Sequence, residues 1–285
     1  PTEEGVEVRA AFTRLWAFYL GLGILAVFLI LAAFPDFFAP YGEQKIVGAP
    51  FLPAGGEFIL GTDEIGRDLL SRLIFAGRHE LFVALGGALA AGVIGSIWGL
   101  IASLWGGVAE WVTLRIMEIV LAVPMLVLAL FLLTVWGRST GIQLLALTIV
   151  MTPVVVRIAR DSGRVLSSRA FVEASLVGGA SRWRVLRRHM LPNAMPTLIV
   201  AMTVVALSSL VVVASLAYLG LGASPSAASW GNMLRVSFGV VYTNPLMGLL
   251  AGGCVILVGT SFSLIGSGLG AVVEVGGFAP RVKRK

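Results

Sequence analysis

Long apolar runs, separated by short polar segments, dominate this chain. The first, Leu15 to Phe34, holds twenty residues without a charge, enough for a helix to cross about 30 Å of hydrocarbon. Further runs predict spans over 81–109, 111–137, 139–156, 194–218 and 246–273. Hydrophobic residues make up 58% of the chain and charged residues 13%, whereas a soluble domain carries about 25% charge. We therefore predict an all-α integral membrane protein with six transmembrane helices.

The polar segments divide the chain into parts. Residues 1–14 are predicted to form an N-terminal tail and 274–285 a basic C-terminal tail, with the first span over 15–34 and a five-helix core over 79–273. Segment 35–78 is rich in Pro, Gly and aromatic residues, so it is predicted to lie outside the membrane. Near its end, Thr62 is expected to cap an amphipathic helix that lies at the membrane interface over 65–74.

Several residues within the spans carry local predictions. Arg115 and Glu118 are spaced to form an ion pair, Pro124 is expected to kink the third span, and Cys254 is expected to be buried in the sixth. Glycines four residues apart permit close helix packing. These pairs are Gly95/Gly99, Gly248/Gly252 and Gly266/Gly270.

The distribution of Lys and Arg predicts the orientation. With both termini in the cytoplasm, fifteen of the 21 basic residues fall on the cytoplasmic side, eight of them between 157 and 193. Cytoplasmic loops of membrane proteins carry an excess of Lys and Arg. We therefore predict a multi-pass protein of the inner or plasma membrane, with loop 157–193 in the cytoplasm. The net charge of +6 then reflects membrane topology, and we expect no nucleic-acid partner.

Loop 157–193 also carries a sequence signature. Gly178 and Gly179 separate two short predicted helices, and Pro192 begins the next apolar run. Glu173-Ala174-Ser175, then Gly179, then Leu191-Pro192-Asn193 resembles the EAA signature of ABC importer permeases, with Ser175 in place of the usual third Ala. The resemblance implies a type I importer permease fold in which this loop docks on an ATPase subunit. The residues to which it assigns this coupling are Glu173, Ala174, Ser175, Gly179, Ala180, Leu191 and Pro192.

Two more segments resemble the dipeptide and oligopeptide branch of these permeases. They are G-T-D-E-I-G-R-D-L-L-S-R over 61–72 and the L-G-L-G and S-W-G-N-M-L groups between 219 and 234. The resemblance implies that the second segment faces a binding protein or forms a gate. Its residues are Leu221, Gly222, Pro225, Trp230, Gly231 and Met233. Judged by position alone, Tyr218 and Trp230 are expected in the aromatic belt at the membrane interface.

Little in the chain suggests catalysis. None of the three lysines follows a glycine, so the phosphate-binding G-K-[ST] motif is absent, and two histidines with one cysteine do not suggest a metal site. We expect no enzyme activity and no cofactor bound by this chain. Ion-coupled transporters usually need an ionisable group at membrane depth, and none lies near the middle of a predicted span. The driving energy is therefore expected to arrive through loop 157–193.

In total, the resemblance is to the C-type permease of a dipeptide or oligopeptide ABC importer. It implies a homologous B-type permease, two ABC ATPase subunits that bind ATP and magnesium, and an extracytoplasmic peptide-binding protein. Peptide would cross between the two permeases by alternating access. Nickel and glutathione importers use the same permease type and remain alternatives, as do an ion-coupled secondary transporter and a purely structural subunit.

Overall fold

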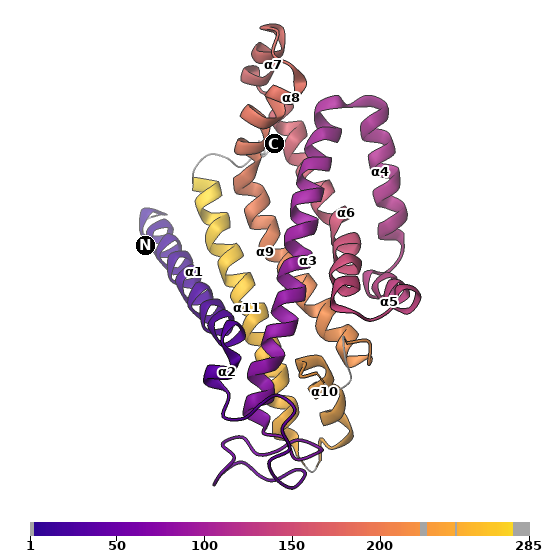
Figure 1. Ribbon diagram of the computed structural model, residues 1–285. Coiled ribbons are helices and arrows are strands. Elements are labelled where there is room, and N and C mark those ends of the chain that lie inside the picture. Colours follow the sequence, from indigo (N-terminus) through magenta and orange to yellow (C-terminus); the bar gives the residue numbers. More distant parts are fainter. Residues whose placement is uncertain (1–2, 223–226, 243, 276–285) are drawn as a thin grey trace.

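The computed structural model describes residues 3–222, 227–242 and 244–275, which form a bundle of long helices (Figure 1). Its elements are α1 (Glu3–Ala33), α2 (Pro35–Phe38), α3 (Leu69–Trp105), α4 (Gly107–Ala122), α5 (Met125–Trp136), α6 (Thr140–Ser167), α7 (Ala170–Val177), α8 (Arg182–Val185), the π-helix η1 (Leu186–Met190), α9 (Leu191–Tyr218), α10 (Trp230–Gly239) and α11 (Pro245–Val275). In this described part, five helices are long and apolar enough to cross a membrane, and α4 with α5 adds a sixth if that bent pair counts as one span.

The bundle has two distinct ends (Figure 1). The short helices α7 and α8 project at one end, which we call the α7 end. Segment 39–68 and α10 lie at the other, the α10 end. Helix α1 runs from the α7 side to the α10 end and α11 runs back. The described starts and ends of the bundle therefore point to the same side, as an even number of spans requires.

Helices α3 and α6 form the tightest part of the core because glycines let their backbones approach. A Cβ atom added at Gly95 would lie 2.6 Å from Val155 Cβ, and one at Gly99 would lie 2.7 Å from Ala159 Cβ. This confirms the first predicted packing pair. In α11, Gly248 packs closely on Ser237 of α10, whereas Gly270 has no neighbour within 4 Å, so the prediction for Gly270 was wrong.

The third span is broken rather than kinked. Helices α4 and α5 meet at 84°, with Val123 extended at φ −88° and ψ 128° between them. A residue before proline avoids the helical region, so Pro124 ends α4 instead of bending a continuous helix. The element also starts at Gly107 rather than near Trp111. The predicted pair of Arg115 and Glu118 is confirmed, with 2.6 Å between Nη1 and Oε2 on an exposed face.

The start of α3 differs from the prediction. Asp68, not Thr62, is its N-cap, since the Ser71 N–H donates to Asp68 Oδ2 at 2.8 Å. Thr62 instead donates through its hydroxyl to Ala49 O at 2.7 Å, which holds segment 39–68 together. No separate interfacial helix exists over 65–74, because α3 already starts at Leu69 and continues into the span.

An ion cluster anchors segment 39–68 on α3. Asp63 is wholly buried, and its Oδ2 lies 2.6 Å from Arg67 Nε and 3.2 Å from Arg72 Nε. Both arginine side chains are almost entirely buried. The polar side of this stretch therefore packs against its own chain and not against lipid headgroups. This is why the amphipathic pattern over 65–74 does not indicate an interfacial helix here.

Candidate functional site

The α7 end is built from a helix, a glycine turn and a second helix. Helix α7 ends at Val177, and Gly179 then takes φ +84°, a conformation that favours glycine. The Gly178 N–H donates to Ala174 O at 2.9 Å and the Ala180 N–H to Ser175 O at 3.0 Å, so the last carbonyls of α7 are satisfied. The predicted division into two short helices at Gly178-Gly179 is confirmed.

One side of α7 is anchored and the other is open. Val172 is fully buried in a cluster with Leu100, Ala159, Val185 and Met190. On the open side, Glu173, Ala174 and Gly179 are exposed, Ser175, Ala180 and Leu191 are half-buried, and Pro192 is exposed. Val177 is 84% exposed. The structure thus brings the predicted coupling residues to one end, with a free surface of small and apolar groups.

Two details of this segment were not foreseen. Among the described residues, Glu173 forms no ion pair with an arginine. Instead, His189 of η1 links the elements: its Nε2 lies 3.4 Å from Ser175 Oγ, and its carbonyl accepts from Asn193 Nδ2 at 2.6 Å. A single histidine after two arginines gave no signal of this role, because its partner on α7 is fourteen residues away.

At the α10 end, the residues predicted for a docking loop are mostly buried. Trp230, Met233 and Gly231 belong to the core. The Trp230 indole donates from Nε1 to Leu73 O at 3.0 Å, so the prediction of an interfacial belt position was wrong for Trp230. Tyr218 is 38% exposed. Pro225 lies outside the described residues.

Glu80 of α3 joins this group, and sequence reasoning missed it. The side chain is fully buried, and its Oε1 accepts from Ser229 Oγ at 2.7 Å and from the Gly231 N–H at 3.0 Å. Ser229 also caps α10. We call Glu80, Ser229, Trp230 and Gly231 the α10 bracket. The available signal was a carboxylate at the edge of an apolar run, directly after Arg78 and His79, but its partners are about 150 positions away in the chain.

Contacts from α6 and from the turn before it hold the loop that follows α9. Gln143 donates from Nε2 to Leu221 O at 3.2 Å, and Arg138 donates from Nη1 to Gly220 O at 3.1 Å. Gln143 Oε1 also lies 3.0 Å from His79 Nε2 of α3. Leu221 and Gly222 are half-buried. The loop therefore rests on Gln143 of α6 and on Arg138 of the turn before α6.

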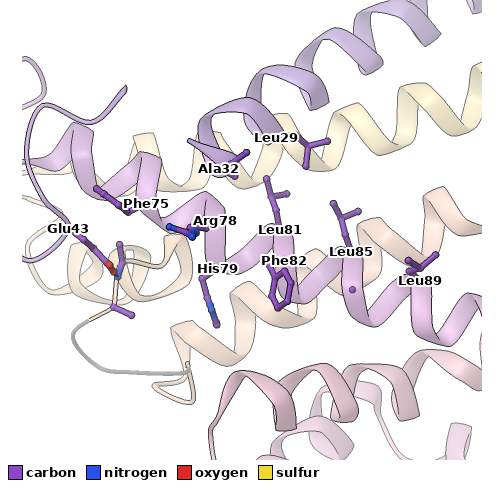
Figure 2. A pocket seen from close by; sticks show the side chains of 14 residues that line it. Leu29, Ala32, Glu43, Phe75, Arg78, His79, Leu81, Phe82, Leu85 and Leu89 are labelled. Carbon is purple, nitrogen blue, oxygen red and sulfur yellow. The ribbon is translucent and has the colours of Figure 1, made fainter. Parts of the chain in front are cut away.

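A cavity of about 890 Å³ opens between α1 and α3 near the α10 end (Figure 2). Apolar side chains such as Leu29, Phe82 and Leu85 line it, with Arg78, His79 and Glu43 toward segment 39–68. None of the predicted site residues lines this cavity. Across the described residues, no three His, Cys, Asp or Glu side chains lie together as metal ligands do.

The helical bundle, with its exposed pair of short helices between α6 and α9, agrees with the permease fold that the sequence resemblance implies. Residues 91–271 match the family described as "Binding-protein-dependent transport system inner membrane component", and the chain belongs to this family. It is an inner-membrane permease component of the type I importer fold.

Individual relatives and a solved structure support this family assignment. The chain is 33% identical to the probable D,D-dipeptide transport system permease protein DdpC of Escherichia coli over 86% of this chain and 83% of the relative. It is 28% identical to the glutathione transport system permease protein GsiD of Pectobacterium atrosepticum, over 94% and 92%. A chain of the inward-facing MetNI methionine ABC transporter shares the fold, with a TM-score of 0.51 and 20% identity over 68% of this chain and 93% of that chain.

Proposed function

We propose that this chain is the C-type permease of an ABC importer for di- or oligopeptides. The observation that carries the substrate class is its similarity to permeases of dipeptide transport, including 34% identity to the dipeptide permease DppC of Escherichia coli over 88% of this chain. A homologous B-type permease, two ATPase subunits and an extracytoplasmic binding protein complete the importer. ATP and magnesium belong to the ATPase subunits.

The α7 end is the proposed cytoplasmic, ATPase-facing end. Its support is the open surface around Ala174 and Gly179, together with exposed arginines on α8 and η1. Basic residues favour the cytoplasmic side. With this orientation, both chain termini lie in the cytoplasm, and segment 39–68 and α10 face the binding protein.

Reconstitution with the neighbouring subunits tests the substrate class. We expect ATP-dependent uptake of a labelled dipeptide into proteoliposomes, reduced by unlabelled di- and tripeptides. Glutathione is the second candidate substrate, because the similarity to a glutathione permease extends over nearly the whole chain. Glutathione and nickel are therefore included as competitors. Competition by glutathione or nickel alone would reassign the substrate. Uptake driven by an ion gradient without ATP would contradict the importer itself.

The burial of the α10 bracket changes the docking prediction. Trp230, Gly231 and Met233 position α10, so bulky changes there should disturb packing rather than touch a partner. The side chains that α10 and the next residues offer to a binding protein are Arg235, Phe238 and Tyr242. Phe238 is 74% exposed and Tyr242 100%, and aromatic and Arg side chains are typical anchors of protein interfaces.

Replacing Phe238 and Tyr242 together by Ser should reduce stimulation of ATP hydrolysis by the loaded binding protein. Loss of two anchors of about 1–2 kcal/mol each, about 2–4 kcal/mol together, corresponds to an increase of roughly thirtyfold or more in the binding-protein concentration needed. The basal ATPase rate and recovery of the complex should stay unchanged. Phe37→Ser, at an 83% exposed position in α2, is the matched control. If the binding protein stimulates ATP hydrolysis equally in both variants and in the parent, α10 is not part of the docking surface.

A further inference from the structure

The exposed sides of α1 and α3 have the composition expected of surfaces in lipid. Near the middle of α3, the exposed residues are Leu89, Val93, Ile94 and Ile97. On α1, Leu20, Leu22 and Val27 are exposed in the same way. These aliphatic surfaces offer no group that would need a hydrogen bond in hydrocarbon.

Helices α9 and α11 differ on their exposed sides. On α11, Thr260, Ser263 and Ser267 are exposed, and their spacing of three and four residues places them on one face. Thr260 lies at the midpoint of α11, Pro245–Val275. On α9, Ser208 and Ser215 are partly exposed, with Ser208 one turn past the middle of the helix. Hydroxyl groups therefore reach the surface at the depth where α3 presents only aliphatic side chains.

Three of these hydroxyls have no hydrogen bond within the described residues. Ser215 donates to Val211 O at 2.7 Å and Ser267 to Leu264 O at 2.9 Å, as helix hydroxyls in an apolar setting commonly do. Ser208, Thr260 and Ser263 make no such contact in this part of the chain. The face is mixed, since Val204, Val211 and Ile256 are exposed beside these hydroxyls. A hydroxyl without a partner is costly in hydrocarbon, and this cost favours contact of the face with water or a polar solute.

The two sets of hydroxyls face the same way. Helices α9 and α11 are antiparallel and meet where Leu207 approaches Gly259 and Thr203 approaches Gly266. Relative to these contact positions, the exposed face of each helix is rotated about the helix axis by about one residue. It contains positions 204, 208 and 211 on α9 and positions 256, 260 and 263 on α11. In an antiparallel pair, an equal rotation away from the contact turns both faces to one side, so they form a joint surface.

A cavity adjoins this surface at the α10 end. It has a volume of about 360 Å³, and its lining includes Val211, Ser215 and Tyr218 of α9 with Leu126 of α5 and Val255 of α11. The exposed face of α9 is therefore hollowed toward the α10 end, with α5 on one side and α11 on the other. This observation is independent of the hydroxyl pattern, and it marks a space where a solute fits.

We infer that the joint face of α9 and α11, with Ser208, Val211, Ser215, Thr260 and Ser263, is the wall that this chain contributes to a water-filled translocation path. The inference rests on the proposed function and specifies which surface performs it. Its hydroxyls both donate and accept hydrogen bonds, which suits the N–H and C=O groups of a peptide backbone. The exposed side chains named on this face carry no charge, so the wall discriminates little between acidic and basic solutes.

Cysteine accessibility in the assembled transporter tests this assignment. The background is Cys254→Ser, because Cys254 is the only cysteine of the chain. Single variants Ser208→Cys, Thr260→Cys and Ser263→Cys are compared with Val93→Cys and Ile97→Cys on the aliphatic side of α3. A charged, membrane-impermeant thiol reagent is applied to nanodiscs, without nucleotide and with a non-hydrolysable ATP analogue.

We expect the three hydroxyl positions to react at least about tenfold faster than both controls in one of the two states, and a peptide substrate to slow the reaction. Labelling no faster than the controls in either state overturns the assignment. Slow labelling together with disulfide cross-linking to the partner permease would show that a packed helix covers this face, which also overturns it. Uptake by the parent protein is measured separately and tests the peptide substrate, whereas the labelling rates test the wall. Failure of the proposed function and failure of this inference are therefore distinguishable.

A charge placed on the wall gives a second readout. Ser263→Asp should change the ratio of uptake of cationic to anionic tripeptides by about tenfold in favour of the cationic ones, since unlike charges attract across a short gap. Val93→Asp, on the aliphatic face of α3, should lower the amount of inserted protein without changing that ratio. An unchanged ratio in Ser263→Asp, at normal expression, contradicts the proposed wall.

Discussion

Replacing Glu80 by Ala is expected to abolish most uptake while the complex still assembles. The change removes the acceptor for the Ser229 hydroxyl and the Gly231 N–H, both buried in the α10 bracket. Each buried donor left unpaired costs about 1–3 kcal/mol. The two unpaired donors together cost about 2–6 kcal/mol, so the ten-residue helix α10 should be held less firmly on α3.

The measurements are peptide uptake, ATPase stimulation by the binding protein and hydrogen exchange of the α10 amides. Uptake should fall by roughly tenfold to a hundredfold and α10 should exchange faster. Glu80→Gln keeps an acceptor oxygen and should retain most activity. Glu118→Ala, which removes a carboxylate from an exposed ion pair, should have little effect, because such pairs contribute about 0–1 kcal/mol. Normal exchange of α10 in Glu80→Ala would show that the bracket is dispensable.

Ala174→Arg should uncouple the permease from its ATPase. Ala174 is exposed on α7, so a larger side chain does not disturb the chain's own core. At a packed interface, however, overfilling costs about 1–3 kcal/mol, and each 1.4 kcal/mol is about tenfold in affinity. Docking should therefore weaken by about one to two decades. Gly179→Arg is a less clean test, because a side chain at φ +84° also strains the backbone.

Co-purification of the ATPase subunits and peptide uptake report the outcome. Val108→Arg adds the same charge at the start of α4, at a 78% exposed position outside the α7–α8 segment, and should leave both unchanged. Equal recovery of ATPase from Ala174→Arg and Val108→Arg would show that α7 is not the coupling helix. Reduced insertion of Ala174→Arg alone would assign the position to folding instead.

The sequence was a good guide wherever a local rule operates. A bilayer demands apolar runs of a set length, so the first, second, fourth, fifth and sixth spans were found with shifts at their ends only. The glycine pair at 178–179 predicted the break between α7 and α8, because a positive φ at Gly179 favours glycine at that position. Gly95 and Gly99 predicted a close helix contact, since small residues allow one, though their partner on α6 was unknown.

Local rules failed where several residues competed for one role. Thr62, Asp63 and Asp68 are all plausible N-caps, and only the contacts with Ala49 and Arg67 decide that Asp68 caps α3. From its residue type alone, Trp230 suits a position in the aromatic belt at the membrane interface as well as a position in the core. Its burial depends on Gly77, where an added Cβ would lie 3.1 Å from the indole. The 84° break at Pro124 exceeds the modest kink that a proline alone suggests.

By itself, the sequence determined the class of this protein. Its apolar runs require a membrane, its basic loop predicts an orientation, and the spacing of Glu173, Gly179 and Pro192 identifies the permease family. Only the tertiary structure decided which residues act together. Glu80 meets Ser229, and His189 meets Ser175. These contacts join residues from separate elements, and a hydrogen bond between distant segments leaves no periodic trace in either of them.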